Sequence, residues 1–155
     1  MKIAELCTHP VVVAFPDQSL AVAAREMRAH DIGALVVVVR DDTRPIGILT
    51  DRDIVRGQVN QCADLRCLSV GEVMTRQPLC IRSDAELSEA IAALASRAVR
   101  RAPVIDAEGA LVGIVTLDDL LPAIAQQVSE LADTVTPRQR QRPCPVPEGA
   151  TLRSA

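Results

Sequence analysis

The sequence predicts an α+β fold in which two pseudo-symmetric β-α-β-β-α motifs pack together through their sheets. Three observations support this prediction: a repeated signature, short runs of β-branched residues, and helical segments with one apolar face. The signature Gly-Ile-aliphatic-Thr-x-x-Asp-aliphatic occurs at 47–54 and again at 113–120. Because a sheet of two or three strands with two helices covers only one of its own faces, two copies packed face to face complete the core.

The repeat extends well beyond its signature. Residues 3–8 align with 70–75 at an offset of 67, and the offset becomes 66 after a turn that is one residue shorter in the second copy. A turn is where a repeat most easily tolerates such a deletion. We therefore predict a first motif at 1–66, a second motif at 67–133, and a flexible Pro- and Arg-rich tail at 134–155.

A helical turn opens each motif, at 3–6 in the first copy and at 70–74 in the second. Ser69 and Glu72 have the spacing of a capping box for the second turn. Short apolar strands are expected to follow the two turns, at 11–14 and 79–81.

An amphipathic helix is expected next in each copy, at 19–30 and at 87–97. The apolar residues of both segments recur at i, i+3, i+4 and i+7, which is typical of a helix with one buried face. Asp17 and Asp84 precede the two helices, and we interpret them as N-caps because a short carboxylate side chain is favoured at that position.

Two strands and a last helix complete each copy. The β-branched and apolar runs at 36–39 and 103–105 indicate buried strands. Each run leads through a turn to a strand that closes a hairpin. These closing strands are expected at 46–49 and 111–115, and the last helices are expected to begin near Asp51 and Leu117.

The composition excludes several classes of function. The chain has 155 residues, 48% of them hydrophobic, and a formal net charge of −3, so no basic field attracts nucleic acid or an anionic membrane. Phe15 is the only aromatic residue, which leaves no stacking platform for single-stranded nucleic acid. The longest apolar run, 34–39, is too short to span a membrane. Five cysteines without a C-x-x-C pair, and no signal peptide, predict free thiols and a cytoplasmic protein.

The repeated Thr-x-x-Asp permits two interpretations. In the first, it is a capping box with Asp in place of the usual Glu, and Gly47 and Gly113 are hairpin glycines at a close backbone approach. In the second, the same helix start is half of a nucleotide site. Its free N–H groups and threonine hydroxyl bind phosphate, and its carboxylate accepts both hydroxyls of a ribose. Small and aliphatic residues then form an adenine slot: Ile48, Ile114, Ala34 and Ala102.

These motifs resemble those of the cystathionine β-synthase (CBS) domain family. The resemblance rests on the doubled Gly-h-h-Thr-x-x-Asp, on Ser-Val-Gly-Glu-Val-Met-Thr between the copies, and on Arg-Ala-Pro-Val-Ile-Asp in the second copy, and it covers about residues 1–125. It implies a tandem CBS pair of the stand-alone bacterial type, with two clefts for adenosyl ligands such as AMP, ADP, ATP, S-adenosylmethionine or NAD. It also implies a homodimer, no required cofactor, and a downstream protein whose activity the module regulates.

The resemblance assigns site residues by motif position. In each copy the Asp holds ribose, the Thr approaches phosphate or ribose, and the aliphatic residue after Gly contacts adenine, while further residues come from the opposite motif. The first cleft then comprises Ile48, Thr50, Asp53, Thr75, Ala102 and Pro103. The second comprises Thr8, Ala34, Val36, Ile114, Thr116 and Asp119.

The two copies differ just before their central strands. Arg100 and Arg101 stand in the second copy where the first has Gly33 and Ala34. Basic residues at this position resemble the phosphate contacts of nucleotide-binding relatives, and a solvated surface pair is the alternative. If the arginines bind phosphate, the two clefts are unequal.

The chain lacks the sequence motifs of common enzymes. It has no nucleophile elbow, P-loop, paired histidines or dinucleotide-binding glycine motif, so we expect no catalytic residue. His9 and His30 have no metal-ligand spacing around them, so we expect no metal site. The alternative to a ligand-binding module is a structural or protein-interaction module whose clefts retain no ligand.

Overall fold

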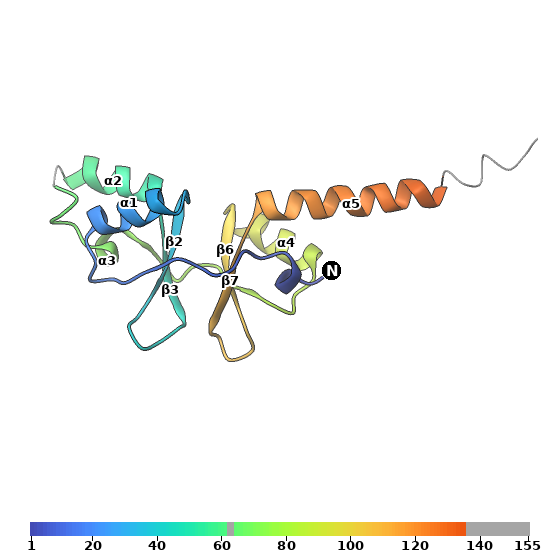
Figure 1. Cartoon of the computed structure of the whole chain (residues 1–155), viewed down its shortest axis with the longest axis horizontal. Coiled ribbons are helices and arrows are strands. Elements are labelled where there is room, and N and C mark those ends of the chain that lie inside the picture. Colours follow the sequence, from blue (N-terminus) through green and yellow to red (C-terminus); the bar gives the residue numbers. More distant parts are fainter. Residues whose placement is uncertain (62–63, 136–155) are drawn as a thin grey trace, which may run out of the picture. The chain divides into compact units, whose positions relative to one another are not determined.

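Two β-sheets organise the first unit of the chain, one for each copy of the repeat (Figure 1). The structure is a computed structural model that describes residues 1–61 and 64–135. The first unit is Met1–Leu121, and a second unit begins at Pro122. The α+β class predicted from the repeat is confirmed.

The first sheet has four strands, which run in the order β1 (Val13–Ala14), β2 (Ala34–Val38), β3 (Pro45–Thr50) and β4 (Thr75–Arg76). Strand β1 is parallel to β2, and the other pairs are antiparallel. Helices α1 (Leu20–Ala29) and α2 (Asp51–Gln61) contact this sheet and each other (Figure 1). All five residues of β2 are buried, as its β-branched sequence indicates.

The second sheet has three strands, which run in the order β5 (Ile81–Arg82), β6 (Arg101–Ile105) and β7 (Leu111–Thr116). It repeats the pattern of the first sheet, with a parallel pair followed by an antiparallel hairpin. Helix α4 (Leu87–Arg97) buries its apolar face, and α5 (Leu117–Val135) starts directly after β7. The opening turns are η1 (Ile3–Glu5) and α3 (Val70–Val73).

Every predicted helix and strand is present, with starts and ends displaced by at most two residues. The predicted tail is an exception at its first residues, because α5 continues through Thr134 and Val135. The remainder of that segment, 136–155, lies outside the described residues.

The predicted N-cap of α1 is wrong. Ser19 is the N-cap, and its hydroxyl accepts a hydrogen bond from the backbone N–H of Val22 at 3.4 Å. Asp17 lies two residues too early and forms an exposed ion pair with Arg40 at 3.0 Å instead. The hydrogen bond from Arg40 lowers the pKa of the Asp17 carboxyl.

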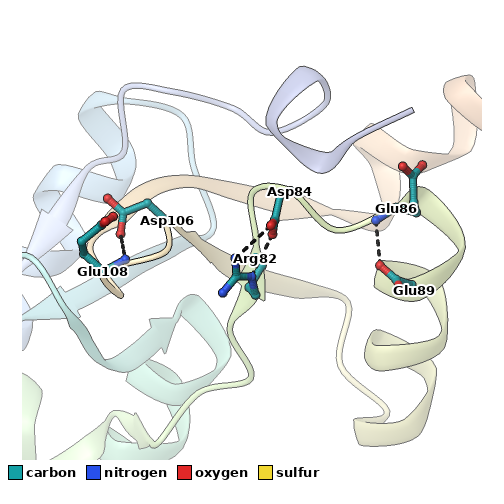
Figure 2. A network of polar contacts seen from close by, with 6 residues as sticks. All are labelled: Arg82, Asp84, Glu86, Glu89, Asp106 and Glu108. Atoms are coloured by element: carbon teal, nitrogen blue, oxygen red, sulfur yellow. Dashed lines mark hydrogen bonds and ion pairs between the residues drawn. The ribbon is translucent and has the colours of Figure 1, made fainter.

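The predicted N-cap of α4 is wrong for the same reason. Glu86 takes that position, and its backbone N–H donates to Oε2 of Glu89 at 2.9 Å (Figure 2). Asp84 instead accepts two hydrogen bonds from Arg82, each 2.8 Å long (Figure 2). These bonds lower the pKa of Asp84 and raise the pKa of Arg82.

The opening turn of each copy docks on the other copy. The backbone N–H of Val70 donates to the carbonyl of Gln18 at 2.8 Å, and the N–H of Ile3 donates to the carbonyl of Ala85 at 3.0 Å. These two bonds are equivalent under the repeat offset of 67. Two copies that exchange their first turns in this way are held together by backbone hydrogen bonds as well as by apolar packing.

The core of the first half therefore contains residues of the second copy. Leu68, Val70 and Met74 are buried in one cluster with Leu20 and Leu49. The first copy thus ends at residue 66 in the sequence, but its hydrophobic core includes side chains from beyond that residue.

Edge strands are exchanged in the same manner. Thr75 in β4 pairs with Ile48 in β3, at the edge of the first sheet. Thr8 pairs with Ile114 in β7 through two backbone hydrogen bonds of 2.8 and 3.1 Å. Each sheet is thereby extended by a residue that follows the opening turn of the other copy.

Gly47 and Gly113 make this approach possible. A Cβ on Gly113 would lie 2.5 Å from Sγ of Cys7 and 3.3 Å from the carbonyl oxygen of Thr8. A Cβ on Gly47 would lie 2.5 Å from Sδ of Met74, with backbone oxygen at 3.1 Å. The prediction that these are hairpin glycines at a close backbone approach is confirmed.

We predict that Gly113→Ala destabilises the protein by about 1–3 kcal/mol, because the added methyl group overpacks a buried backbone contact. Denaturant unfolding measures the change. Gly33→Ala is the control, since a Cβ there meets its nearest atoms at an ordinary 3.5 and 3.6 Å. Equal stability of Gly113→Ala and the wild type would contradict the close approach.

We also predict a pH-dependent effect of Glu72→Gln. The hydroxyl and backbone N–H of Ser69 donate to Oε2 of Glu72 at 2.6 and 2.7 Å, and these bonds lower the pKa of its carboxyl. The resulting stabilisation is fully present above the unfolded-state pKa of about 4.3 and is lost as the pH falls through the lower folded-state pKa.

The melting temperatures of wild type and Glu72→Gln should therefore differ at neutral pH and converge in acid. Glu5→Gln changes the equivalent position of the first copy, where the turn has no side-chain cap, and serves as the control. A difference for Glu72→Gln that does not change with pH would refute this account of the capping box.

Candidate functional site

Thr50 and Asp53 lie where β3 meets α2, and they form a reciprocal capping box. The backbone N–H and the hydroxyl of Thr50 donate to Oδ2 of Asp53 at 3.0 and 2.7 Å. The N–H of Asp53 donates back to Oγ1 of Thr50 at 3.2 Å. The capping interpretation of the signature is confirmed for this copy.

Thr116 and Asp119 form the same box where β7 meets α5. The corresponding distances are 2.8, 2.7 and 3.3 Å. All the bonds from Thr116 go to Oδ2 of Asp119, so they do not use Oδ1. A carboxylate has acceptor capacity on both oxygens, so one Asp can cap a helix and accept a hydroxyl group at once.

A cleft of about 240 Å³ opens beside Thr116 and Asp119. Its walls come from both copies of the repeat. Six of the predicted site residues line it: Thr8, Ala34, Arg101, Ile114, Thr116 and Asp119. The structure thus brings together five of the six residues of the second predicted cleft, all but Val36, with Arg101 added.

The cleft also contains residues that sequence reasoning missed. These are Pro10, Val11, Val12, Ile32 and Gly33. They lie close to Thr8 or Ala34 in the sequence. This closeness to two predicted site residues is the sequence feature from which they could have been predicted. The apolar side chains of Pro10, Val11, Val12 and Ile32 make this wall of the cleft hydrophobic.

Other predicted site residues lie elsewhere. Val36, Ala102 and Pro103 are fully buried. They are not among the residues that line the open cleft, and their assignment to a ligand site stays a prediction. Arg100 is exposed, and its carbonyl accepts the N–H of Leu117 at 2.9 Å.

The first-copy group is arranged differently. Register pairing places Thr75 beside Ile48, two residues before Thr50 on β3. The pocket found at Asp53, however, lies between α2 and α3 and shares no other residue with the predicted first cleft. The two Thr-x-x-Asp capping boxes thus have equivalent hydrogen bonds and different surroundings.

Arg101 is one residue that distinguishes the second capping box from the first. It pairs with Thr116 in the β6–β7 hairpin and lines the cleft. Its guanidinium extends to the first copy, where a Cβ on Gly33 would lie 3.6 Å from Nη1 of Arg101 and 3.5 Å from Oδ2 of Asp51. The small residue at 33 therefore leaves room for the arginine beside the cleft.

Cys7 packs against Gly113, close to the Thr116–Asp119 capping box. Burial raises the pKa of its thiol, and the negative charge of Asp119 raises it further. A thiol with a raised pKa carries little thiolate at neutral pH and is a poor nucleophile. Cys7 therefore supports the packing of the cleft rather than its chemistry.

Within the described residues, no group of three or more His, Cys, Asp or Glu side chains could hold a metal ion. A search of the same residues finds no helix with the length and hydrophobicity needed to cross a bilayer.

Comparison with known families identifies the class of protein. The CBS domain model matches residues 3–60 and again 70–126, which together are more than half of the chain. The chain therefore belongs to the CBS domain family and carries two CBS motifs in tandem. The resemblance inferred from the doubled signature is confirmed.

Individual relatives show the same architecture. Hypoxic response protein 1 of Mycobacterium tuberculosis is 40% identical over 103 residues, which cover 66% of this chain and 71% of that protein. The crystal structure of that protein, determined with two coordinated zinc ions, matches with a TM-score of 0.70 at 35% identity and covers 77% of this chain and 96% of the other.

Two further relatives extend the comparison. An uncharacterized protein of Methanopyrus kandleri is 32% identical over 121 residues, or 78% of this chain, and the match spans only 61% of that protein's length. The crystal structure of CBSX2 in complex with AMP matches with a TM-score of 0.68 at 26% identity, covering 83% of this chain and 98% of the other.

We predict that Asp119→Asn increases the alkylation rate of Cys7 by about twofold or more, because removal of the nearby negative charge lowers the pKa of the thiol and raises its thiolate fraction. Iodoacetamide labelling followed by peptide mass spectrometry measures the rate, with exposed Cys67 as the internal reference. Asp53→Asn, in the other corner, should leave the rate unchanged. An unchanged rate in Asp119→Asn would place Asp119 too far from Cys7 to act on it.

Proposed function

We propose that this CBS pair is a regulatory module that binds an adenosyl ligand in the cleft beside Thr116 and Asp119. The observation that carries the proposal is the convergence, in one cleft, of a carboxylate, a hydroxyl at a helix start, an arginine and an apolar wall. These are the groups needed for the ribose, phosphate and base of a nucleotide.

The ribose would be held by Asp119. Its Oδ2 is occupied by Thr116 at 2.7 Å, which fixes the orientation of the carboxylate. A fixed carboxylate loses little freedom when it accepts the hydroxyl groups of a ribose, so the capping box prepares the binding site.

The phosphate would lie at the start of α5, near the side chain of Arg101. The N–H groups of Leu117 and Asp119 already donate to Arg100 and Thr116, so the helix start attracts an anion mainly through its partial positive charge. The guanidinium adds a charged hydrogen-bond donor in a half-buried position, where charge-assisted bonds to phosphate are strong. This arrangement supports a nucleotide over a nucleoside.

The base would occupy the apolar side of the cleft. Ile114, Ala34 and Val12 offer small and aliphatic walls, and the backbone polar groups nearby can supply hydrogen bonds. The chain has no tyrosine or tryptophan, so aliphatic contact replaces aromatic stacking.

The relatives support this choice of ligand class. CBSX2, at 26% identity, was crystallised in complex with AMP. The same module can serve AMP, ADP, ATP, S-adenosylmethionine or NAD, and Arg101 favours those that place a phosphate at the helix start.

We further infer that the module regulates another protein rather than catalysing a reaction. The cleft offers no activated nucleophile, since burial and Asp119 raise the pKa of its neighbouring thiol. The regulated protein, the homodimer and the cytoplasmic location stay predictions.

Binding is tested by thermal shift and calorimetry with AMP, adenosine, ADP, ATP, S-adenosylmethionine and NAD. We predict that AMP raises the melting temperature of the full chain and that Asp119→Asn weakens AMP and adenosine alike by about tenfold or more, because it removes a charged acceptor. Asp53→Asn, in the first copy, should change both affinities less.

Arg101→Ala should weaken AMP by about tenfold and leave adenosine nearly unchanged, because only AMP carries a phosphate. Arg100→Ala is the matched control, since it removes an adjacent exposed arginine that does not line the cleft. If Arg101→Ala affects AMP and adenosine equally, its phosphate role is wrong. If no ligand stabilises the protein at millimolar concentration, the cleft holds no adenosyl ligand and the structural-module alternative stands.

A further inference from the structure

Two opposite charges from different copies of the repeat meet beside the cleft. Nη1 of Arg101 lies 3.6 Å from the position that a Cβ on Gly33 would occupy, and Oδ2 of Asp51 lies 3.5 Å from the same position. The guanidinium and the carboxylate are therefore separated by no more than the sum of these two distances. No ion pair joins them in the described part of the chain, so the donors of Arg101 are not taken up by Asp51.

The repeat does not duplicate this pair of charges. Its offsets equate Arg101 with Ala34 and Asp51 with Leu117, so the equivalent positions carry neither charge. The backbone at the two places is nevertheless alike. The N–H of Asp51 and that of Leu117 each donate to the carbonyl of the residue before the central strand, at 3.3 and 2.9 Å. The difference between the two places thus lies in the side chains alone.

The cleft itself offers little positive charge. Of the described residues that line it, Arg101 and Asp119 are the charged ones, and they have opposite signs. One guanidinium can bind one phosphate group through paired hydrogen bonds. Each further phosphate adds negative charge that no second lining arginine or lysine offsets. That charge also lies within the reach of the Asp51 carboxylate, because the Debye length is about 8 to 10 Å at moderate salt.

We propose that Asp51 is a specificity-determining residue of the adenosyl cleft and selects ligands with one phosphate group over diphosphates and triphosphates. The inference rests on the proposed function and adds to it which members of the ligand class the cleft accepts. Asp51 does not line the cleft, so its carboxylate acts on the phosphates through space, by repulsion that grows with the charge of the ligand.

The test is calorimetry of the full chain with adenosine, AMP, ADP and ATP, without magnesium so that each nucleotide carries its full charge. Wild type should bind AMP more tightly than ATP. Asp51→Asn removes the charge but keeps the Oδ1 acceptor, which receives the N–H of Arg52 at 2.7 Å. It should leave the affinity for adenosine unchanged, raise that for AMP about twofold and raise that for ATP about fivefold or more, because the lost repulsion scales with ligand charge.

Asp42→Asn is the matched control. Asp42 follows β2, whereas Gly33 precedes it, and a strand of five residues spans about 16 Å. Its Oδ1 accepts the N–H of Arg44 at 2.9 Å, so asparagine again keeps the acceptor and removes only the charge. Because the charge is removed beyond the Debye length of the phosphates, the ratio of ATP to AMP affinity should change by less than about twofold.

Two further measurements separate charge from packing. The gain in ATP affinity of Asp51→Asn should shrink as salt is added, because screening shortens the reach of a carboxylate and leaves side-chain packing unaffected. Asp51→Glu keeps the charge and should keep the preference for AMP over ATP. Melting temperatures without ligand verify that each variant remains folded.

A wild type that binds ATP more tightly than AMP would overturn the proposal. So would an Asp51→Asn variant whose affinities for adenosine, AMP and ATP all change by one factor, because charge would then not be the cause. If wild type binds neither adenosine nor any of the three nucleotides, the proposed function fails and this inference fails with it. Binding without the graded response contradicts the role of Asp51 alone.

Discussion

The exchange of edge segments between the two sheets is the contact on which both the fold and the cleft depend. Thr8 pairs with Ile114 and Thr75 pairs with Ile48, each across the repeat boundary. Without this exchange Thr8 would not lie in the same cleft as Thr116 and Asp119. The close approach needs glycine on the receiving strand, since a methyl group at 113 would lie 2.5 Å from Sγ of Cys7. The glycine of the signature is thus a packing requirement, and the cleft is its consequence.

The Thr-x-x-Asp pair combines structural and chemical roles in the same atoms. The hydroxyl and N–H of Thr116 hold Oδ2 of Asp119 at 2.7 and 2.8 Å, and the carboxylate in return caps α5. Capping orients the carboxylate and leaves its other oxygen outside these bonds. A helix cap and a ribose acceptor therefore do not compete, and the proposed ligand site needs no rearrangement of its polar groups.

The two copies share a fold and differ in what they present to solvent. Gly33 in the first copy leaves room at the place where the guanidinium of Arg101 reaches across from the second. The last helices differ as well, since α2 has 11 residues and α5 has 19. A duplicated fold can therefore acquire one charged cleft through changes that leave both sheets and both capping boxes intact.

Local sequence determined the elements of this protein. Apolar periodicity located the helices, β-branched runs located the strands, and the spacing of Ser69 and Glu72 identified a capping box, because each of these depends on residues a few positions apart. The residues Asp17 and Asp84 were misjudged as caps, since an offset of two residues turns a capping position into a partner for arginine. Only the tertiary structure decided that the opening turns dock on the opposite copies, that Arg101 lines the cleft while Arg100 does not, and that Val36 and Ala102 are fully buried. These outcomes depend on which distant segments pair and on which face each strand turns inward, and such long-range contacts are not encoded in the spacing of neighbouring residues.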